Sequence, residues 1–214
     1  MDLVKLHEKL KKGAVFLKDD YEDIVLRLVV IGESTHCFTK RRGRNEVEVD
    51  STDKDILNPK CLVMKSVKKR MKNFNELRDK AMQIATEVHK TQVDKGGKPY
   101  IGHPLRVESL CNDDDCKIVA LLHDTIEDGD ITAEYLLMQG FPTYIVDAVL
   151  SVSRNKGEDY FDFIQRCKAN PIGRRVKIAD LKDNMDITRL NELTDNDIER
   201  LKKYHQAYKM LEKE

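Results

Sequence analysis

The sequence predicts a mainly α-helical protein that begins with a small β-rich module. Three observations predict it: strand-type segments before residue 65, helical periodicity after residue 73, and a change of charge between these two parts. Residues 1–73 carry 17 Lys and Arg against 12 Asp and Glu, a net charge of +5, and residues 74–214 carry 21 against 26, a net of −5. We therefore expect two domains, 1–73 and 74–214.

The N-terminal part contains an expected helix at 2–12 and then short segments typical of strands. These segments are rich in apolar, β-branched or aromatic residues, and they lie at 13–17, 26–31, 36–39 and 46–50. The last of them alternates with a period of two, and residues 42–45, Arg-Gly-Arg-Asn, fit a hairpin turn before it. We expect a small β-rich module to about residue 65 and a linker after it.

Apolar residues begin to recur at helical spacing after Asn73. The residues that share one helical face are Leu77, Ala81, Ile84, Ala85 and Val88. Asn73 or Asn75 is the expected N-cap of this helix, because short polar side chains accept hydrogen bonds from the free N–H groups of a helix start. Residues 74–214 are therefore expected to form an all-α domain.

Further helices are marked by the residues at their ends. Pro104 suits the first turn of a helix, and Gly140 with Pro142 separates one helix from the next. The acidic run at 113–115 suits the positive end of the helix that follows it. Later helices are expected at 159–169, 172–190 and 195–212, the last with Thr194 as its N-cap.

The composition is typical of a soluble, highly charged globular protein, with 40% hydrophobic and 36% charged residues and a formal net charge of zero. The longest apolar run, 24–31, is interrupted by Arg27 and falls short of the roughly 20 residues that a membrane span needs. The N-terminus lacks the apolar core of a signal peptide, so we expect a cytoplasmic protein. The five cysteines include no Cys-x-x-Cys pair, which argues against a disulfide framework and a cysteine zinc site.

A His-Asp pair follows the apolar run that ends at Leu122, and this pair is the most informative feature of the chain. His123 and Asp124, with His103 upstream and Asp180 downstream, supply two imidazoles and two carboxylates. Such a set suits a divalent cation and leaves coordination positions for water and substrate. The pattern predicts metal-dependent hydrolysis, and the alternative is a core histidine beside a helix acid.

Two more acids follow on the same expected helix. Glu127 and Asp128 lie three and four residues beyond Asp124, so that they share its helical face. Carboxylates grouped in a partly buried helix raise one another's pKa, and a bound cation is the simplest compensation. The grouping therefore supports a metal site.

Three segments of the chain resemble the HD-domain metal-dependent phosphohydrolases, specifically the hydrolase domain of the Rel/SpoT alarmone enzymes. Residues 97–107 are similar to the family's Gly-x-Pro-Tyr-Ile-x-His-Pro segment, and residues 121–128 to its Leu-Leu-His-Asp-x-x-Glu-Asp segment. Residues 176–185 are similar to its Val-Lys-x-Ala-Asp-x-x-x-Asn-Met segment. The order and spacing of the segments also agree, and the resemblance covers about 77–190.

The resemblance implies an HD-type helical bundle and assigns roles to residues of this chain. The implied metal ligands are His103, His123, Asp124 and Asp180, and the implied pair that positions and activates the attacking water is Glu127 and Asp128. Lys95 and Asn184 would face the nucleotide substrate, and Lys177, in a matched segment, would contact phosphate. The implied metal is manganese, and the implied reaction removes pyrophosphate from the 3′ position of guanosine tetra- or pentaphosphate.

The sequence departs from the family pattern around the nucleotide. Position 94, where the family has a basic residue that packs on the guanine, is Asp94, and position 96 is Gly rather than Ser. Ile187 replaces a small polar residue of the family. No segment of synthetase size follows residue 190, so the expectation is a stand-alone hydrolase.

Several alternatives stay open on the sequence alone. The basic runs at 40–44 and 65–72 favour a solvated hairpin tip and a solvated linker over nucleic-acid contacts, because aromatic residues do not interleave them. The basic residues around Asp180 are phosphate contacts or ordinary ion-pair partners of nearby acids: Arg174, Arg175 and Lys182 with Asp183, Asp186 or Glu192. His89 matches a family histidine but is expected to be packed or capping.

The sequence also leaves more than one substrate, function and oligomeric state open. The substrate is alarmone-like or is another nucleotide, as for an HD phosphatase or phosphodiesterase. A different interpretation is a regulatory module that binds nucleotide or metal without cleavage. The oligomeric state stays open.

Overall fold

The computed structural model describes strands in the N-terminal part and a nearly continuous helical part. The described residues are 15–19, 24–31, 34–41, 47–49, 59–190 and 192–213, with side chains described from residue 73 onward. The expected helix at 2–12 and the expected hairpin turn at 42–45 lie outside them. Backbone contacts divide the chain into two compact units, Met1–Phe74 and Asn75–Glu214.

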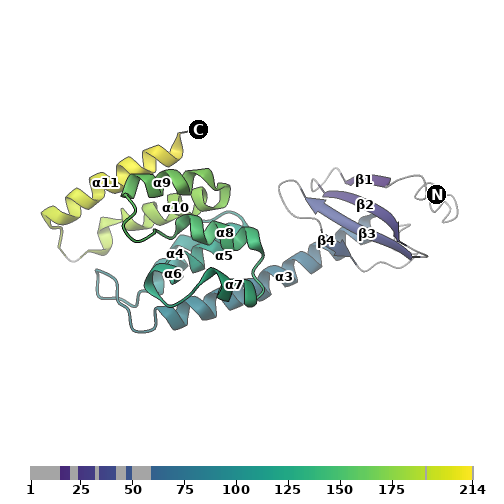
Figure 1. The fold of residues 1–214 in the computed structure, drawn as a ribbon, viewed down its shortest axis with the longest axis horizontal. Helices are drawn as coiled ribbons and strands as arrows, with labels where there is room; N and C mark the ends of the chain where they lie inside the picture. Colours follow the sequence, from purple (N-terminus) through teal and green to yellow (C-terminus); the bar gives the residue numbers. More distant parts are fainter. Residues whose placement is uncertain are drawn as a thin grey trace. The chain divides into compact units, whose positions relative to one another are not determined.

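The described strands of the first unit pair in one antiparallel sheet, in the order of the chain (Figure 1). They are β1 (Val15–Asp19), β2 (Ile24–Ile31), β3 (Ser34–Arg41) and β4 (Val47–Val49). Val15 pairs with Leu28 across β1 and β2, and Val29 pairs with His36 across β2 and β3. Antiparallel neighbours need only short connections, which agrees with the close spacing of these segments in the sequence.

Helix α3 (Pro59–Val88) begins earlier than the sequence predicted. The expected N-caps Asn73 and Asn75 lie inside this helix, and the prediction of a linker at 65–72 was wrong because these residues are helical. The segment has no Gly or Pro after its first residue and is rich in Lys, Arg, Met and Leu, which favour helix. In the second unit its buried residues include Ala81, Ile84 and Ala85, as the apolar spacing predicted.

The described part of the second unit is built from helices around a central helix, α10 (Pro171–Asn184) (Figure 1). The others are α4 (Gly102–Ser109), α5 (Asp114–Leu122), α6 (Thr125–Asp128), α7 (Ala133–Met138), α8 (Thr143–Val152), α9 (Tyr160–Ala169), the 3-10 helix η1 (Ile187–Arg189) and α11 (Asp195–Glu212). Helix α10 contacts α4, α5, α8, α9 and α11. The expected mainly helical fold is confirmed.

Side chains cap several of these helices at the positions that the sequence indicates. Thr194 caps α11 and forms a capping box with Asp197, as predicted. Asp113 caps α5 by accepting a hydrogen bond from the backbone N–H of Cys116. Gly140 follows the end of α7 with a φ of 88°, a left-handed conformation that glycine adopts readily.

The helix expected at 172–190 is shorter in the structure. Helix α10 ends at Asn184, and η1 follows it after a break. Asp186 Oδ1 accepts hydrogen bonds from the backbone N–H and the hydroxyl of Thr188 at 3.1 and 2.6 Å. This local turn competes with continued helix. The chain therefore turns, and Arg189 reaches Asp94 in the loop after α3.

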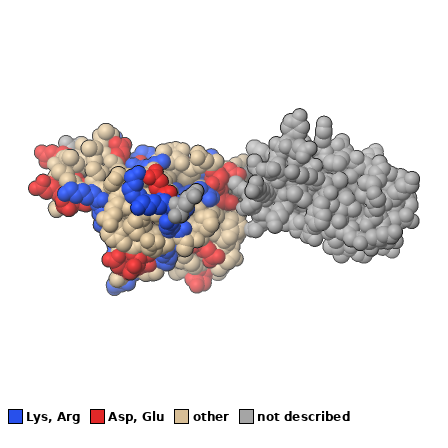
Figure 2. Space-filling view, turned by 90° about the horizontal axis from the view of Figure 1, so that it is seen from above, with Lys and Arg blue, Asp and Glu red and all other residues tan. Residues whose placement is uncertain are grey.

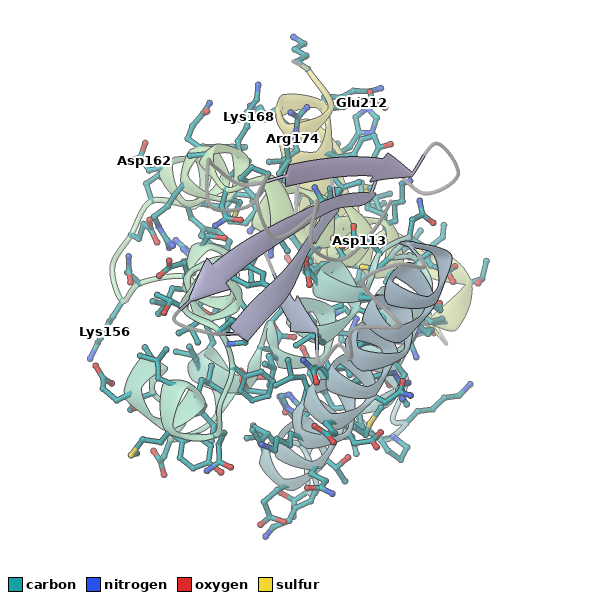
Figure 3. All side chains as sticks on the ribbon, turned by 90° about the vertical axis from the view of Figure 1, so that its right-hand side faces the viewer. Asp113, Lys156, Asp162, Lys168, Arg174 and Glu212 are labelled. Carbon is teal, nitrogen blue, oxygen red and sulfur yellow. The ribbon has the colours of Figure 1, made fainter. Side chains whose placement is uncertain are left out.

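The core of the second unit is apolar, and α10 packs closely against its neighbours. The largest fully buried apolar side chains are Leu121, Leu122, Leu136, Ile145, Ile164, Leu181 and Leu211. A Cβ on Gly173 would lie 2.0 Å from Ser151 Oγ, so α10 approaches α8 more closely than a side chain at this position allows. Arg174 donates to the carbonyls of Leu211 and Glu212 and joins α10 to the end of α11 (Figure 3).

The surface of the second unit carries both signs of charge. Acidic and basic side chains lie beside one another over the face seen in Figure 2. Among the described residues, Cys111, Cys116 and Cys167 are free and buried thiols. No helix in the described part of the chain combines the length and apolar character needed to cross a membrane.

Candidate metal centre

The predicted metal ligands come from three places in the second unit. His103 lies in the first turn of α4, Asp180 lies within α10, and His123 with Asp124 connects α5 to α6. The single helix expected across 120–128 is therefore interrupted at the His-Asp pair. This correction places the two ligands at a helix junction rather than inside a helix.

The interruption has local causes. The Thr125 hydroxyl donates to the Leu122 carbonyl at 2.8 Å, and His123 Nδ1 donates to the Ala120 carbonyl at 2.7 Å. These side-chain bonds occupy carbonyl oxygens at the point where α5 ends. Asp124 Oδ2 lies 3.0 Å from His123 Nε2, so the two side chains still converge.

The candidate ligand atoms meet at one buried point. His103 Nε2 lies 3.1 Å from Asp180 Oδ1 and 3.2 Å from His123 Nε2. Asp124 Oδ2 lies 3.6 Å from His103 Nε2. One ligand atom from each of His103, His123 and Asp180 lies within 4.8 Å of the others, and all three residues are buried. The fold therefore brings the four predicted ligands together.

The hydrogen bonds of the two imidazoles fit a cation between them. His103 Nδ1 is bonded to Asp183 Oδ2 at 2.6 Å, and His123 Nδ1 is bonded to the Ala120 carbonyl at 2.7 Å. Because acceptors occupy both Nδ1 atoms, each ring turns its Nε2 toward the other Nε2, 3.2 Å away, and toward the carboxylate of Asp180. A divalent cation at this point can coordinate both Nε2 atoms in place of protons. The residues present therefore fit a metal.

The charges around this point also favour a cation. Burial lowers the pKa of His123, but the carboxylates of Asp124 and Asp180 raise it well above its usual value. Burial raises the pKa of Asp180, but Lys177 and the two histidines hold it well below its usual value. Lys177 Nζ lies 2.7 Å from Asp180 Oδ2, and Asn184 Nδ2 donates to Asp180 Oδ1. The structure thus places Lys177 and Asn184, both predicted substrate contacts, against a candidate metal ligand.

Glu127, the predicted proton acceptor, lies on the short helix α6 next to the cluster. Its Oε1 accepts the backbone N–H of Arg154 at 2.7 Å. Burial raises the pKa of Glu127, the bond from Arg154 lowers it and the charge of Asp124 raises it, and the net shift is upward. A carboxylate with a raised pKa is a better proton acceptor near neutral pH.

Asp128, the second predicted acid, is held from the loop that follows α3. Gln92 Nε2 donates to Asp128 Oδ2 at 3.0 Å, and Gln92 Oε1 is bonded to His89 Nδ1 at 2.7 Å. His89 is 2% exposed, and its ring lies against that of Tyr100 with centroids 4.8 Å apart. His89 therefore packs and orients Gln92, in agreement with the expectation that it is a packed histidine.

A cavity of about 230 Å³ lies beside the cluster. It is lined by the candidate ligand His103, by the predicted substrate contacts Lys95 and Asn184, and by Asp94 and Arg189. Lys95 Nζ lies 3.1 Å from Asp197 Oδ1. The cavity thus lies between the candidate ligand His103 and two of the predicted substrate contacts, Lys95 and Asn184. Lys177, the third predicted contact, does not line it.

Several curated proteins are similar to part of this chain, although no family model matches it. A guanosine-3′,5′-bis(diphosphate) 3′-pyrophosphohydrolase of Aquifex aeolicus is 33% identical over 118 residues, which is 50% of this chain and 17% of that protein. A protein of the same name from Haemophilus influenzae is 37% identical over 75 residues, or 33% of this chain and 11% of that protein. A GTP pyrophosphokinase of Myxococcus xanthus is 40% identical over 81 residues, or 35% of this chain and 11% of that protein.

A solved structure, described as a metazoan orthologue of SpoT that hydrolyses ppGpp, shares the fold. Its TM-score is 0.53 at 20% identity, over 63% of this chain and 84% of that chain. The second unit resembles the HD domain of (p)ppGpp hydrolases. The chain spans about a sixth of the length of the A. aeolicus relative and less of the other two. Residues 75–214 are called the HD unit below.

Asp183 of the HD unit, expected only as an ion-pair partner, contacts a candidate metal ligand. Its Oδ2 accepts from His103 Nδ1 at 2.6 Å, and its Oδ1 accepts from Arg106 Nε at 2.7 Å. Burial raises the pKa of Asp183, but His103 and Arg106 lower it to about 2. An ionised carboxylate here fixes the tautomer and orientation of the His103 ring. Its signal in the sequence is spacing, since Asp183 follows Asp180 by three residues and Arg106 follows His103 by three.

Tyr100 is a second contact of the HD unit that the residue pattern left unassigned. Its hydroxyl donates to Asp124 Oδ2 at 2.6 Å. Burial and then the charge of Asp124 raise the pKa of Tyr100, so the hydroxyl stays protonated and remains a donor. Its ring lies between His89 and His103, with centroids 4.8 and 5.5 Å away. Tyr100 therefore orients one candidate ligand by a hydrogen bond and packs against another.

Proposed function

We propose that this chain is a metal-dependent phosphohydrolase that releases pyrophosphate from a guanosine nucleotide of the guanosine 3′,5′-bis(diphosphate) type. The observation that carries the proposal is the convergence of two histidines and two aspartates beside a separate acid pair. The names of the A. aeolicus and H. influenzae relatives supply the substrate class. The fold shared with the SpoT orthologue supports the same choice.

The proposed metal is Mn²⁺, held by the four side chains that converge: His103, His123, Asp124 and Asp180. Mixed imidazole and carboxylate donors suit a borderline-hard divalent ion. When bound, the ion supplies Lewis-acid polarisation of a phosphate oxygen. Asp183 and Tyr100 hold the ligands in orientation through their bonds to His103 and Asp124.

Glu127 and Asp128 are proposed to manage the attacking water. Glu127 accepts the proton, because its pKa is raised toward the working range and its Oε1 is fixed by the Arg154 N–H. Asp128 positions the water, and the bond from Gln92 holds its carboxylate in one orientation. Glu127 is therefore proposed to take the proton, and Asp128 to position the water.

The cavity residues are proposed to contact the nucleotide. Lys95 and Asn184 line the cavity beside His103, so a substrate whose phosphate reaches the metal passes both. Lys177 remains a proposed phosphate contact, and its bond to Asp180 keeps its ammonium group next to the metal. These contacts orient the substrate for attack.

We also propose that residues 1–73 form a β-rich module of their own and that residues 74–214 form the hydrolase domain. The pairing of β1 to β4 and the division into two compact units support this arrangement. The cytoplasmic location expected from the sequence stays a prediction.

A second candidate function is an HD phosphatase or phosphodiesterase that acts on another nucleotide. The observation that favours it is Asp94, which lines the cavity with a carboxylate where a base-packing cation was expected from the resemblance. A negative side chain at this point changes which nucleobase or ribose groups are accepted.

A substrate panel separates these functions. The purified chain is incubated with Mn²⁺, Zn²⁺, Fe²⁺ or Mg²⁺ and with guanosine 3′,5′-bis(diphosphate) or other nucleotides, and released phosphate and pyrophosphate are measured. We expect pyrophosphate release from the guanosine compound with Mn²⁺. Asp124→Ala and Glu127→Gln are expected to lower kcat by about 100-fold or more, because one removes a ligand and the other the proton acceptor.

Asp162→Asn is the matched control, since Asp162 is an exposed acid on α9. Full activity of folded Asp124→Ala and Glu127→Gln variants would contradict the proposal. Release from a different nucleotide supports the second candidate. Tight nucleotide binding without any released phosphate or pyrophosphate supports a regulatory module instead.

A further inference from the structure

The cavity of the HD unit has two kinds of lining. One part belongs to the candidate metal cluster: His103 is a ligand, Tyr100 donates to Asp124, and Asn184 donates to Asp180. The other part comes from the loop after α3, from η1 and from α11. At about 230 Å³ the cavity is smaller than the roughly 300–1,000 Å³ of sites that enclose a drug-sized ligand, so it takes one portion of a nucleotide.

The cations of the second part are already paired with carboxylates of the protein. Lys95 and Arg200 both lie close to Asp197, at 3.1 and 3.2 Å. Arg189 lies 3.7 Å from Asp94 and 3.3 Å from Asp183. A phosphate group placed here would lie near a carboxylate beside each cation, and the repulsion from these carboxylates would cancel much of its attraction to the cations. This part of the cavity therefore suits an uncharged group that forms hydrogen bonds, such as a nucleobase.

Arg189 is held in this wall by its surroundings. Asp94 Oδ1 accepts the backbone N–H groups of Gly96 and Lys98 at 2.9 Å each, which folds the loop around the carboxylate. A Cβ on Gly96 would lie 2.8 Å from the Arg189 carbonyl oxygen, so the loop packs directly on this residue. The Arg189 side chain is 25% exposed. Arg189 is therefore held by carboxylates, and part of its side chain stays accessible at the cavity wall.

We propose that Arg189 contacts the nucleobase of the substrate, and that Asp94 is a positioning residue that acts through Arg189. The assignment rests on the proposed function as a nucleotide hydrolase. A planar guanidinium stacks on an aromatic ring and donates hydrogen bonds in a fixed geometry, which an ammonium group does not do. Asp94 then acts by holding a cation that η1 supplies, since Asp94 Oδ2 lies 3.7 Å from Arg189 Nη1.

The test compares Arg189→Met, Arg189→Lys and Asp94→Asn with the unmodified chain in Mn²⁺. For each variant we measure kcat and KM for guanosine 3′,5′-bis(diphosphate). We also measure the inhibition constants of GDP, which carries the base, and of inorganic pyrophosphate, which lacks it. We expect Arg189→Met to raise KM and the GDP constant by about 5- to 100-fold, the range of base stacking on a side chain. The pyrophosphate constant is expected to rise by about fivefold less than the GDP constant, because pyrophosphate lacks the base.

Arg189→Lys distinguishes a base contact from a phosphate contact. If the planar group is required, the lysine variant is expected to be as impaired as the methionine variant. Asp94→Asn keeps an oxygen for the loop N–H groups but loses the charge, and we expect a smaller rise in KM and in the GDP constant than in Arg189→Met. Arg175→Met is the matched control, because Arg175 also pairs with an aspartate, Asp113, but does not line the cavity.

Three outcomes overturn the assignment: unchanged KM in Arg189→Met, restoration of KM by lysine, or equal increases in the GDP and pyrophosphate constants. If Arg189→Met does not fold, the Asp94→Asn, Arg189→Met double variant removes the carboxylate that the single variant leaves unpaired at position 94, and the same constants are measured on it. An unmodified chain that hydrolyses no nucleotide overturns the proposed function as well. An active unmodified chain with unaffected Arg189 variants overturns this assignment alone.

Discussion

Each histidine of the candidate metal centre uses one ring nitrogen for the protein and turns the other toward the cluster. His123 is fixed by a backbone carbonyl and His103 by the carboxylate of Asp183. A charged acceptor binds more strongly than a neutral one and raises the basicity of the opposite ring nitrogen. His103 and Arg106 keep Asp183 ionised although it is buried. The geometry of the candidate metal centre therefore depends on a residue that is not one of the candidate ligands.

Asp183→Asn is expected to weaken metal binding by roughly 10- to 100-fold, the usual loss when a carboxylate partner of a ligating histidine is removed. The amide fills the same space but carries no charge, so His103 loses its strong acceptor. The measurement is Mn²⁺ affinity of the metal-free protein by competition with a chelator of known affinity, which needs no substrate.

Asp186→Asn serves as the control for this prediction, because Asp186 lies on the same segment but bonds Thr188 rather than a histidine. If Asp183→Asn binds Mn²⁺ as tightly as the unmodified chain, Asp183 does not act through His103.

At the scale of elements, α10 determines the geometry of the site. It carries Lys177, Asp180, Asp183 and Asn184, and it contacts helices on several sides. Its distance from α8 is set at Gly173, where Ser151 occupies the space of a side chain. Helix propensity alone would favour Ala over Gly at this position. The close packing therefore outweighs the local preference.

Gly173→Ala is expected to reduce the free energy of unfolding by about 1–3 kcal/mol, the usual cost of overpacking a core. The added methyl group would meet Ser151 Oγ at 2.0 Å, so either the hydroxyl leaves its bond to the Ala148 carbonyl or α10 moves away from α8. The free energy is measured by urea unfolding followed by circular dichroism.

The double variant Ser151→Ala, Gly173→Ala provides the control. Removing the hydroxyl leaves the Ser151 Cβ at 3.3 Å from the new methyl group, so the double variant is expected to recover much of the loss. Additive effects of the two substitutions would show that this contact is not the cause.

For the whole molecule, the candidate metal centre connects parts that are far apart in sequence. Its ligands come from α4, from the junction of α5 and α6, and from α10. The carboxylates of Asp124 and Asp180 repel each other at this point, and a bound cation reduces this repulsion. An ion that binds the folded chain and not the unfolded chain therefore stabilises the fold as a whole.

Mn²⁺ at about 100 times its dissociation constant is expected to stabilise the folded chain by about 2.7 kcal/mol and to raise Tm by roughly 5–10 °C. Asp180→Asn is expected to lose this increase because it removes a ligand charge. The measurement is the difference in Tm with Mn²⁺ and with a chelator, and Asp162→Asn is the control. An equal Mn²⁺ response in the Asp180→Asn variant would place the ion elsewhere.

The sequence alone predicted the mainly helical character of residues 74–214, the Thr194 cap and the residues that form the candidate metal centre. These features depend on local spacing and on residue type, which the chain displays directly. The sequence did not predict the start of α3 at Pro59, because absence of a helix breaker is a weaker signal than a cap. It also missed the break at His123 and Asp124, where side-chain bonds end α5.

Only the tertiary structure decided which charges meet. Asp183 contacts His103 across 80 positions of the chain, and Arg189 contacts Asp94 across the fold. Helical spacing tells which residues share one face of a helix, but it does not tell which other helix packs against that face. The candidate metal ligands could therefore be chosen from their types and motifs, whereas their partners and the pocket wall depend on packing between distant segments.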